Sequence, residues 1–178
     1  GGLGSAVAEA FGSRGSHVVL AARGRDALEA TAERVDSAGG TATIEPLDVR
    51  DEDGVVEAFA EHGPVDVIVA CAGIIDGAPG EMALTEAGYD DFDRVVETNV
   101  RGLFATLREG VQFLAEDGRV LVPSGRVARE PHEGMGVYGV SKAADEGLVR
   151  GFAADADQTV GIVEPGLVAT ELTGGQGR

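Results

Sequence analysis

His17-Val18-Val19-Leu20-Ala21-Ala22-Arg23-Gly24-Arg25 is an apolar, β-branched run that ends in small residues and two arginines. A pattern with helical spacing follows at 25–38, so the segment predicts a buried strand that turns into a helix. The same alternation recurs along the chain. Further strands are predicted at 41–47, 65–70, 119–122 and 159–163, and further helices at 53–61, about 89–115 and 137–154. This order predicts an α/β fold with a doubly wound parallel sheet, covered by helices on both faces.

The two ends of the sequence depart from this alternation. The chain opens with Gly1-Gly2-Leu3-Gly4 and passes directly into a helical pattern at 5–11, with no strand pattern before the glycine-rich turn. In a doubly wound sheet that strand is the central one, so we expect a strand to precede Gly1 in the complete molecule. Residues 173–178 carry no strand pattern either. We therefore expect residues 1–178 to form a single domain that is truncated at both ends.

Composition and charge argue against several classes of binding partner. The formal net charge is −17 and is spread along the chain, which argues against binding to nucleic acid or to an anionic membrane. The single cysteine, Cys71, excludes an internal disulfide and favours the cytoplasm. No apolar run reaches the ~18 residues that a membrane span needs, and no signal-peptide pattern is visible. We expect a cytoplasmic protein without a membrane or nucleic-acid partner.

The one lysine of the chain lies four positions after a tyrosine, in Tyr138-Gly139-Val140-Ser141-Lys142. Residues four apart share a helix face, so the Lys142 ammonium can lie beside the Tyr138 phenol. A nearby cation lowers the pKa of a phenol from about 10 toward the pH at which a general acid/base operates. A compact ammonium can also reach a sugar hydroxyl. The alternative is a solvated helix face on which the two side chains merely coexist.

Two segments have the chemistry of a dinucleotide site. Gly2-Leu3-Gly4 at the start of a helix is a candidate phosphate cradle, although a structural turn would have the same composition. At the end of the strand 17–22, an acid would accept a hydrogen bond from a ribose 2′-hydroxyl, whereas an arginine would pair with a 2′-phosphate. Arg23 stands there without an acid, which favours NADP over NAD. The alternative is that Arg23 and Arg25 are surface arginines of a loop.

The order of these segments resembles the short-chain dehydrogenase/reductase family over nearly the whole chain. Gly2-Leu3-Gly4 is similar to the end of the family's TGxxxGxG loop, and Leu47-Asp48-Val49 is similar to its adenine contact. Val69-Ala70-Cys71-Ala72-Gly73 resembles the NNAG turn, and Asn99 matches the asparagine of the catalytic tetrad. Tyr138 and Lys142 match the YxxxK pair, and residues 164–170 resemble the PG segment beside the nicotinamide.

The resemblance implies a Rossmann-type NAD(P) domain and assigns roles to individual residues. Tyr138 exchanges a proton with the substrate oxygen, Lys142 binds the nicotinamide ribose and lowers the pKa of Tyr138, and Asn99 holds a water that relays protons. The alternative for Asn99 is a satisfied buried amide at a local bend. The implied cofactor site comprises Gly2, Leu3, Gly4, Arg23, Asp48, Val49, Ala72, Gly73, Lys142, Pro165, Gly166, Val168 and Thr170.

Two motifs depart from the family pattern. The substrate-orienting serine usually lies thirteen residues before the tyrosine, which is Gly125 here, so Ser124 takes that role only if the loop has one extra residue. Without it, the site lacks an oxyanion donor. In the NNAG turn, Ala70 and Cys71 replace both asparagines, and Cys71 has the surroundings of a small buried hydrophobe rather than of a metal ligand.

These observations predict an NADP(H)-preferring oxidoreductase that interconverts a ketone or aldehyde and an alcohol. The partner is a small-molecule substrate, and the family implies a homodimer or homotetramer. The rival interpretation is a catalytically impaired nucleotide-binding protein, a sensor or structural partner, which the altered turn and Gly125 would suit. We expect no metal site, because His62 and His132 fall in loops and His17 at a strand start, without metal-ligand spacing.

Overall fold

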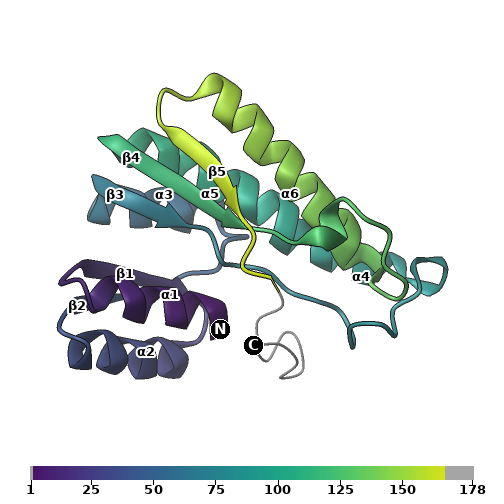
Figure 1. Ribbon diagram of the computed structural model, residues 1–178, viewed down its shortest axis with the longest axis horizontal. Helices are drawn as coiled ribbons and strands as arrows, with labels where there is room; N and C mark the ends of the chain where they lie inside the picture. The colour runs from purple at the N-terminus through teal and green to yellow at the C-terminus, as the bar shows by residue number, and fades with distance from the viewer. Residues whose placement is uncertain (1, 167–178) are drawn as a thin grey trace.

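Five parallel strands carry the fold in the computed structural model, which describes residues 2–166 (Figure 1). The strands are β1 (His17–Ala22), β2 (Thr41–Pro46), β3 (Val65–Val69), β4 (Leu114–Pro123) and β5 (Thr159–Val163). All neighbouring strands pair in parallel, and helices connect most of them. The predicted Rossmann-like α/β fold is therefore confirmed, with all five predicted strands in place.

The helices divide between two hydrophobic cores. They are α1 (Gly2–Gly12), α2 (Arg25–Ser37), α3 (Glu52–His62), α4 (Tyr89–Val95), α5 (Gly102–Gly110) and α6 (Gly136–Asp155). One core joins α1 and α2 to β1 and includes the fully buried Val35. The larger one joins α5 and α6 to β3, β4 and β5 around Leu107 and Val120. α1, α2, α5 and α6 therefore bury apolar side chains against the strands beside them.

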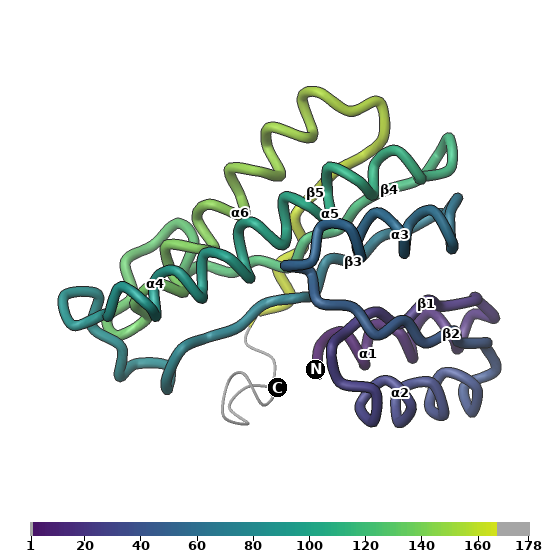
Figure 2. Tube along the Cα trace, turned by 180° about the vertical axis from the view of Figure 1, so that it is seen from behind, coloured from purple at the N-terminus to yellow at the C-terminus, as the bar shows by residue number. Residues whose placement is uncertain are grey.

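The strands form two sheets rather than one. β1 pairs only with β2, and β4 lies between β3 and β5 in a three-stranded sheet. The two sheets lie side by side with β1 and β3 at their facing edges, and no strand among residues 2–166 pairs with both (Figures 1 and 2). Backbone groups on these two edges therefore lack the ladder partners that a central strand supplies.

The helix predicted at about 89–115 is interrupted. It comprises α4, a π-helical turn at Val96–Arg101, α5 and a 3-10 turn at Val111–Phe113. The apolar residues keep helical spacing through the π turn, so the sequence pattern conceals it. At the far end the prediction was wrong, because Leu114 pairs with Val65 and begins β4. A register irregularity between Val65 and Val67 then accommodates the residues that precede Arg119.

Polar residues fix the start of α3. The Asp51 side chain accepts a hydrogen bond from the Gly54 backbone N–H at 3.2 Å, and Glu52 and Asp53 lie in the first turn, where the helix dipole favours negative charge. This cap holds the turn at 47–51, which follows β2. Among residues 2–166 no helix is both long and apolar enough to cross a membrane.

Candidate active site

The predicted site residues gather where the strands end. Arg23 follows β1, Asp48 and Val49 follow β2, and Ala72 and Gly73 follow β3. Ser124 follows β4, and Pro165 and Gly166 follow β5. Ligands of open α/β sheets bind outside the carboxyl ends of the strands, so the fold brings these residues to the edge where a nucleotide would lie. Val168 and Thr170 lie outside the described residues.

Tyr138 and Lys142 lie one turn apart on α6, as predicted from their spacing. The Lys142 ammonium donates hydrogen bonds to the Pro123 backbone carbonyl and to Asp145 Oδ2, both at 2.8 Å. Asp145 is buried, and its Oδ1 has no hydrogen-bond partner among the described residues. Sequence reasoning missed Asp145, although its position three residues after Lys142 predicts that the two side chains meet on a helix.

The pKa of Tyr138 moves in the direction opposite to the prediction. Burial of the phenol raises the pKa, and the negative charge of Asp145 raises it further. The predicted lowering by Lys142 is not found, and the Lys142 ammonium lies against the Asp145 carboxylate at 2.8 Å. The Asp145 carboxyl itself has a raised pKa, because burial outweighs the attraction of Lys142.

Asn99 occupies the π turn and is fully buried. Its Oδ1 accepts a hydrogen bond from the Ile74 backbone N–H at 2.8 Å, and its Nδ2 donates to the Ile74 carbonyl and to Ser141 Oγ, both at 2.9 Å. Ser141 in turn donates to the Tyr138 carbonyl. The side chain therefore has the arrangement of a satisfied buried amide, and it braces the segment after β3 against α6. π turns are frequent at functional sites, and this one places Asn99 for that contact.

The Ser124 hydroxyl is engaged by Glu146. It donates to Glu146 Oε1 at 2.9 Å, and the buried Glu146 carboxylate also pairs with Arg129 at 3.2 Å. No hydrogen bond joins Ser124 to Tyr138 within the described part of the chain. Gly125 has extended backbone, with φ −163° and ψ 173°, and a Cβ added there would meet no atom within 4 Å. Sequence reasoning also missed Glu146, which lies next to Asp145 on α6 and is buried.

The residues that follow β1 and β2 are more exposed. Arg50 donates to both carboxylate oxygens of Asp48, with Nη2–Oδ2 at 2.6 Å, and these hydrogen bonds lower the pKa of Asp48 to about 2. Arg23 is exposed, lies close enough to Asp48 to favour its charge, and has no ion-pair partner among residues 2–166. Val49 packs on α5, where a Cβ added to Gly102 would lie 2.5 Å from Val49 Cγ2.

The glycine-rich segment forms the first turn of α1. Gly4 lies against Cys71, with 3.4 Å between an added Cβ and Cys71 Cβ, so α1 begins beside the turn after β3. Helix N-termini attract phosphates, and this placement fits a dinucleotide at the same edge. Cys71 is half-buried, and burial raises the pKa of its thiol, which keeps it protonated.

A pocket of about 210 Å³ opens beside Tyr138. Its wall combines the start of α6 with the segment at 76–91, which an isolated bridge between Met82 and Met135 fastens to the residues before α6. The carboxylates of this wall belong to Asp76, Glu81, Glu86 and Asp91. Arg94 pairs with Asp76 and Asp91, so part of this negative charge is compensated.

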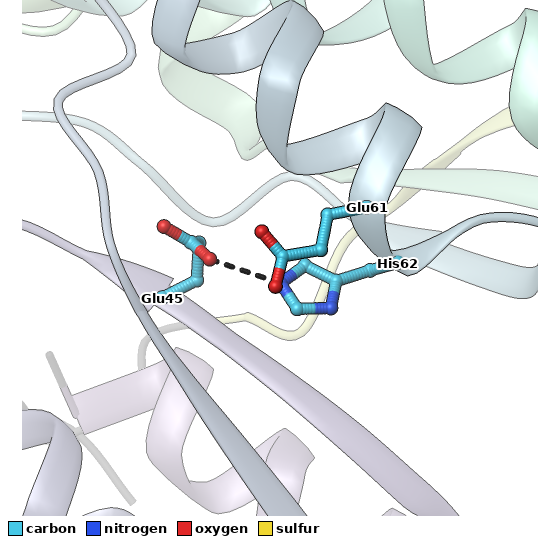
Figure 3. A group of neighbouring side chains, drawn as sticks. All are labelled: Glu45, Glu61 and His62. Atoms are coloured by element: carbon cyan, nitrogen blue, oxygen red, sulfur yellow. Dashed lines mark hydrogen bonds and ion pairs between the residues drawn. The ribbon is translucent and has the colours of Figure 1, made fainter.

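Three possible metal ligands also come together, although no sequence spacing predicted them. Glu45 of β2 and Glu61 and His62 of α3 place their ligand atoms within 4.8 Å of one another (Figure 3). His62 is the last residue of α3 rather than a loop residue, and its Nε2 bonds to Glu45 Oε2 at 2.9 Å. That hydrogen bond accounts for the approach of β2 and α3 without a cation. His62 precedes the amino end of β3, whereas Glu45 lies near the carboxyl end of β2.

The amino-acid sequence is similar to those of known proteins. Residues 1–177 match the short chain dehydrogenase family. A glycine betaine reductase of Emericella nidulans is 35% identical over 97% of this chain and 14% of its own length. A versicolorin reductase of the same organism is 34% identical, over 96% of this chain and 67% of its own. A cyclic-di-GMP-binding biofilm dispersal mediator protein of Escherichia coli is 32% identical, over 99% and 73%.

Solved structures share the fold. A double mutant of a Serratia marcescens short-chain dehydrogenase/reductase superposes with a TM-score of 0.86, at 31% identity, over 99% of this chain and 74% of that one. An alcohol dehydrogenase from Thermococcus sibiricus, complexed with 5-hydroxy-NADP, has a TM-score of 0.80 at 29% identity over 96% and 74%. The sequence match and the fold agree. The chain therefore belongs to the short-chain dehydrogenase/reductase family of NAD(P)-dependent oxidoreductases.

Proposed function

We propose that the protein is an NADP(H)-preferring oxidoreductase that interconverts a ketone or aldehyde and an alcohol, and that residues 1–178 form its NAD(P)-binding domain. The observation that carries the proposal is Tyr138, which lines a pocket at the carboxyl edge with Lys142 one turn behind it. The bound nicotinamide supplies or accepts the hydride. Tyr138 donates its phenolic proton to the carbonyl oxygen in reduction and recovers it in oxidation. The raised pKa of Tyr138 keeps that proton on the phenol at neutral pH.

The residues at the edge fit a dinucleotide. The first turn of α1 takes the pyrophosphate, Asp48 and Val49 take the adenine, and Lys142 reaches the nicotinamide ribose. Asp48 keeps free lone pairs even when bonded to Arg50, since a carboxylate accepts about four hydrogen bonds. Ala72, Gly73, Pro165 and Gly166 complete the cofactor surface in the proposal.

The preference for NADP rests on Arg23. Its exposed guanidinium has no ion-pair partner within residues 2–166 and lies at the end of β1, where a 2′-phosphate would be. We expect Arg23→Ala to weaken NADPH binding at least about tenfold, the effect of losing one charge-assisted contact, and to leave NADH binding nearly unchanged. Titration calorimetry with both cofactors measures this, with Arg25→Ala as the neighbouring control. Equal losses for the two cofactors contradict the preference.

The pocket charge favours neutral or cationic carbonyl substrates. Four carboxylates line the pocket, so an anionic substrate meets like charge there. A panel of neutral ketones, aminoketones and keto acids with NADPH tests both the activity and the preference. Tyr138→Phe is expected to lower kcat by about 10²-fold or more, because the proton donor is lost. Turnover that survives this substitution, or turnover limited to keto acids, contradicts the proposal.

A second candidate is a nucleotide sensor without turnover. It is favoured by the Ser124 hydroxyl, which is bound to Glu146, and by the Escherichia coli relative, which is named for cyclic-di-GMP binding. Calorimetry with cyclic-di-GMP separates the two functions. Binding of cyclic-di-GMP together with a failure to reduce every ketone favours the sensor, whereas NADPH-dependent reduction without such binding favours the enzyme.

A further inference from the structure

The buried carboxylate of Asp145 has no role in the proposed reaction, and its surroundings point to one. It lies on α6 three residues after Lys142 and is 3% exposed. One oxygen accepts a hydrogen bond from the Lys142 ammonium at 2.8 Å, and the other has no partner among the described residues. A buried charge with one unpaired oxygen is costly to fold around, so it needs an explanation beyond packing.

Asp145 and Pro123 together fix the position of Lys142. The ammonium has three N–H groups, of which two point to Asp145 Oδ2 and to the Pro123 carbonyl. Pro123 is the last residue of β4, so these bonds tie the ammonium both to its own helix and to the sheet. One N–H remains for a ligand or for the phenol. Asp145 and Pro123 therefore orient the Lys142 ammonium and leave it one N–H for any other contact.

Asp145 also controls how much positive charge Tyr138 experiences. An ammonium in contact with a carboxylate acts on a third group as a dipole rather than as a net charge, so its pull on a phenolate is reduced. In agreement, both burial and the Asp145 charge raise the pKa of Tyr138. Other ionisable groups lie on the elements packed against α6, on α6 itself or around the pocket beside Tyr138. They include Cys71, Asp76, Glu81, Glu86, Asp90, Asp91, Asp93, Arg94, Glu97, Arg101, Arg108, Glu109, Arg126, Arg129, Glu146 and Arg150.

We propose that Asp145 is a positioning residue that holds the Lys142 ammonium at the end of β4 and offsets the charge of that ammonium at the Tyr138 phenol. This inference rests on the proposed roles of Tyr138 and Lys142. The consequence is a shift in the pH at which the phenolate forms. Alcohol oxidation, which needs the phenolate, should therefore require a more alkaline pH with Asp145 present than in its absence.

The chain allows a direct test, because it has two tyrosines and no tryptophan. Tyr89 is 92% exposed, so Tyr89→Phe leaves Tyr138 as the sole phenol at little structural cost. The ultraviolet absorbance of the phenolate then reports the Tyr138 titration, while circular dichroism at each pH verifies that the fold persists. In this background we expect Asp145→Asn to lower the Tyr138 titration midpoint by about 1 pH unit, the size of shift that a neighbouring charge produces.

Two further variants make the test selective. Asp155→Asn removes the same charge from the exposed end of α6, about 15 Å away by helix rise, and should leave the midpoint unchanged. Asp145→Leu replaces the buried carboxylate with an apolar side chain and should lower the midpoint as Asp145→Asn does. An unchanged midpoint in both Asp145 variants, or an equal shift in Asp155→Asn, overturns the proposal. The titration requires no substrate, so it decides the role of Asp145 even if no ketone is reduced.

Kinetics add a second readout. In the Asp145→Asn enzyme the alkaline decline of kcat for NADPH-dependent ketone reduction should begin about 1 pH unit lower, with KM for the ketone unchanged. A uniform loss of kcat at every pH indicates a purely structural role and contradicts the proposal.

Discussion

Two ion pairs lie near the carboxyl ends of the strands, one after β2 and one on α6 next to Tyr138. Arg50 contacts Asp48 at 2.6 Å, and Lys142 contacts Asp145 at 2.8 Å. The Asp48 side chain is 28% exposed, whereas that of Asp145 is 5% exposed. Their pKa values nevertheless move in opposite directions, to about 2 for Asp48 and upward for Asp145.

The difference shows that a cation alone does not set the ionisation of a carboxylate. Asp48 receives hydrogen bonds from the guanidinium at both oxygens and another from the Arg50 backbone, and water reaches it. Asp145 receives its hydrogen bond from Lys142 at one oxygen and is removed from water, so desolvation outweighs the attraction. The exposed pair suits binding of a polar cofactor, and the buried pair suits control of the phenol.

Breaking the buried pair should have the largest effect. Lys142→Met leaves Asp145 buried without its cation, and we expect the free energy of unfolding at pH 7 to fall by about 3 kcal/mol. Arg50→Met breaks the exposed pair and should cost far less, because water replaces the lost contact. Urea denaturation of both variants measures the two losses. The double variant Lys142→Met/Asp145→Leu should recover most of the loss, and equal losses for the two single variants would show that burial does not distinguish the pairs.

The second-largest effect is expected when the turn that carries the exposed Asp48–Arg50 pair is overpacked. In Gly102→Ala the new Cβ would lie 2.5 Å from Val49 Cγ2, so the turn that carries Asp48 must move. We expect a loss of about 1–3 kcal/mol in stability, as for other overpacked sites, together with weaker NADPH binding. The Tyr138 titration should not change. Gly151→Ala is the control, because a Cβ there meets no atom within 4 Å and α6 should gain about 0.5–1 kcal/mol. Unchanged NADPH binding in Gly102→Ala would separate the turn from the cofactor site.

Sequence patterns predicted the strands well, because the buried strands of a parallel sheet need short apolar runs and the chain has few other runs of that kind. β1 and β5 have the predicted bounds, at His17–Ala22 and Thr159–Val163. The π turn was invisible, since its apolar residues keep helical spacing. Leu114 was misplaced because an apolar residue after a helix looks the same whether it ends the helix or begins a strand.

At the site, spacing predicted that Tyr138 and Lys142 share a helix face but not the sign of the pKa shift. That sign depends on burial and on Asp145, which long-range packing determines. The direction of the Ser124 hydroxyl depends on Glu146, 22 residues further along. Motif position alone cannot show which of two neighbouring side chains faces the substrate.

The pH dependence of stability should separate the two carboxylates, with a smaller effect. Asp48 has a lowered pKa, so its contribution is present above the unfolded value of about 4 and is lost as pH falls toward 2. After screening by water it is less than about 1 kcal/mol. Asp145 has a raised pKa, so the folded state loses stability as pH rises from about 4 through the folded pKa. Denaturation of Asp48→Asn and Asp145→Asn between pH 2 and 7 should therefore remove slopes of opposite sign. Slopes of the same sign would contradict the comparison.

Ser124 and Gly125 differ in the same way, because the Ser124 hydroxyl already has a hydrogen-bond partner whereas the space beside Gly125 is empty. Substitutions at these two positions should have the smallest effect on stability. The Ser124 hydroxyl is bound to Glu146, so Ser124→Ala should cost about 1 kcal/mol and change kcat less than about twofold. Gly125→Ser places a hydroxyl thirteen residues before Tyr138 in extended backbone with open space, so stability should stay within about 0.5 kcal/mol. If the carbonyl oxygen lacks a second donor, this variant should raise kcat for ketone reduction about tenfold or more, because oxyanion donors act in the transition state. A large loss of kcat in Ser124→Ala with no gain in Gly125→Ser would instead identify Ser124 as the orienting hydroxyl, which must then leave Glu146 when substrate binds.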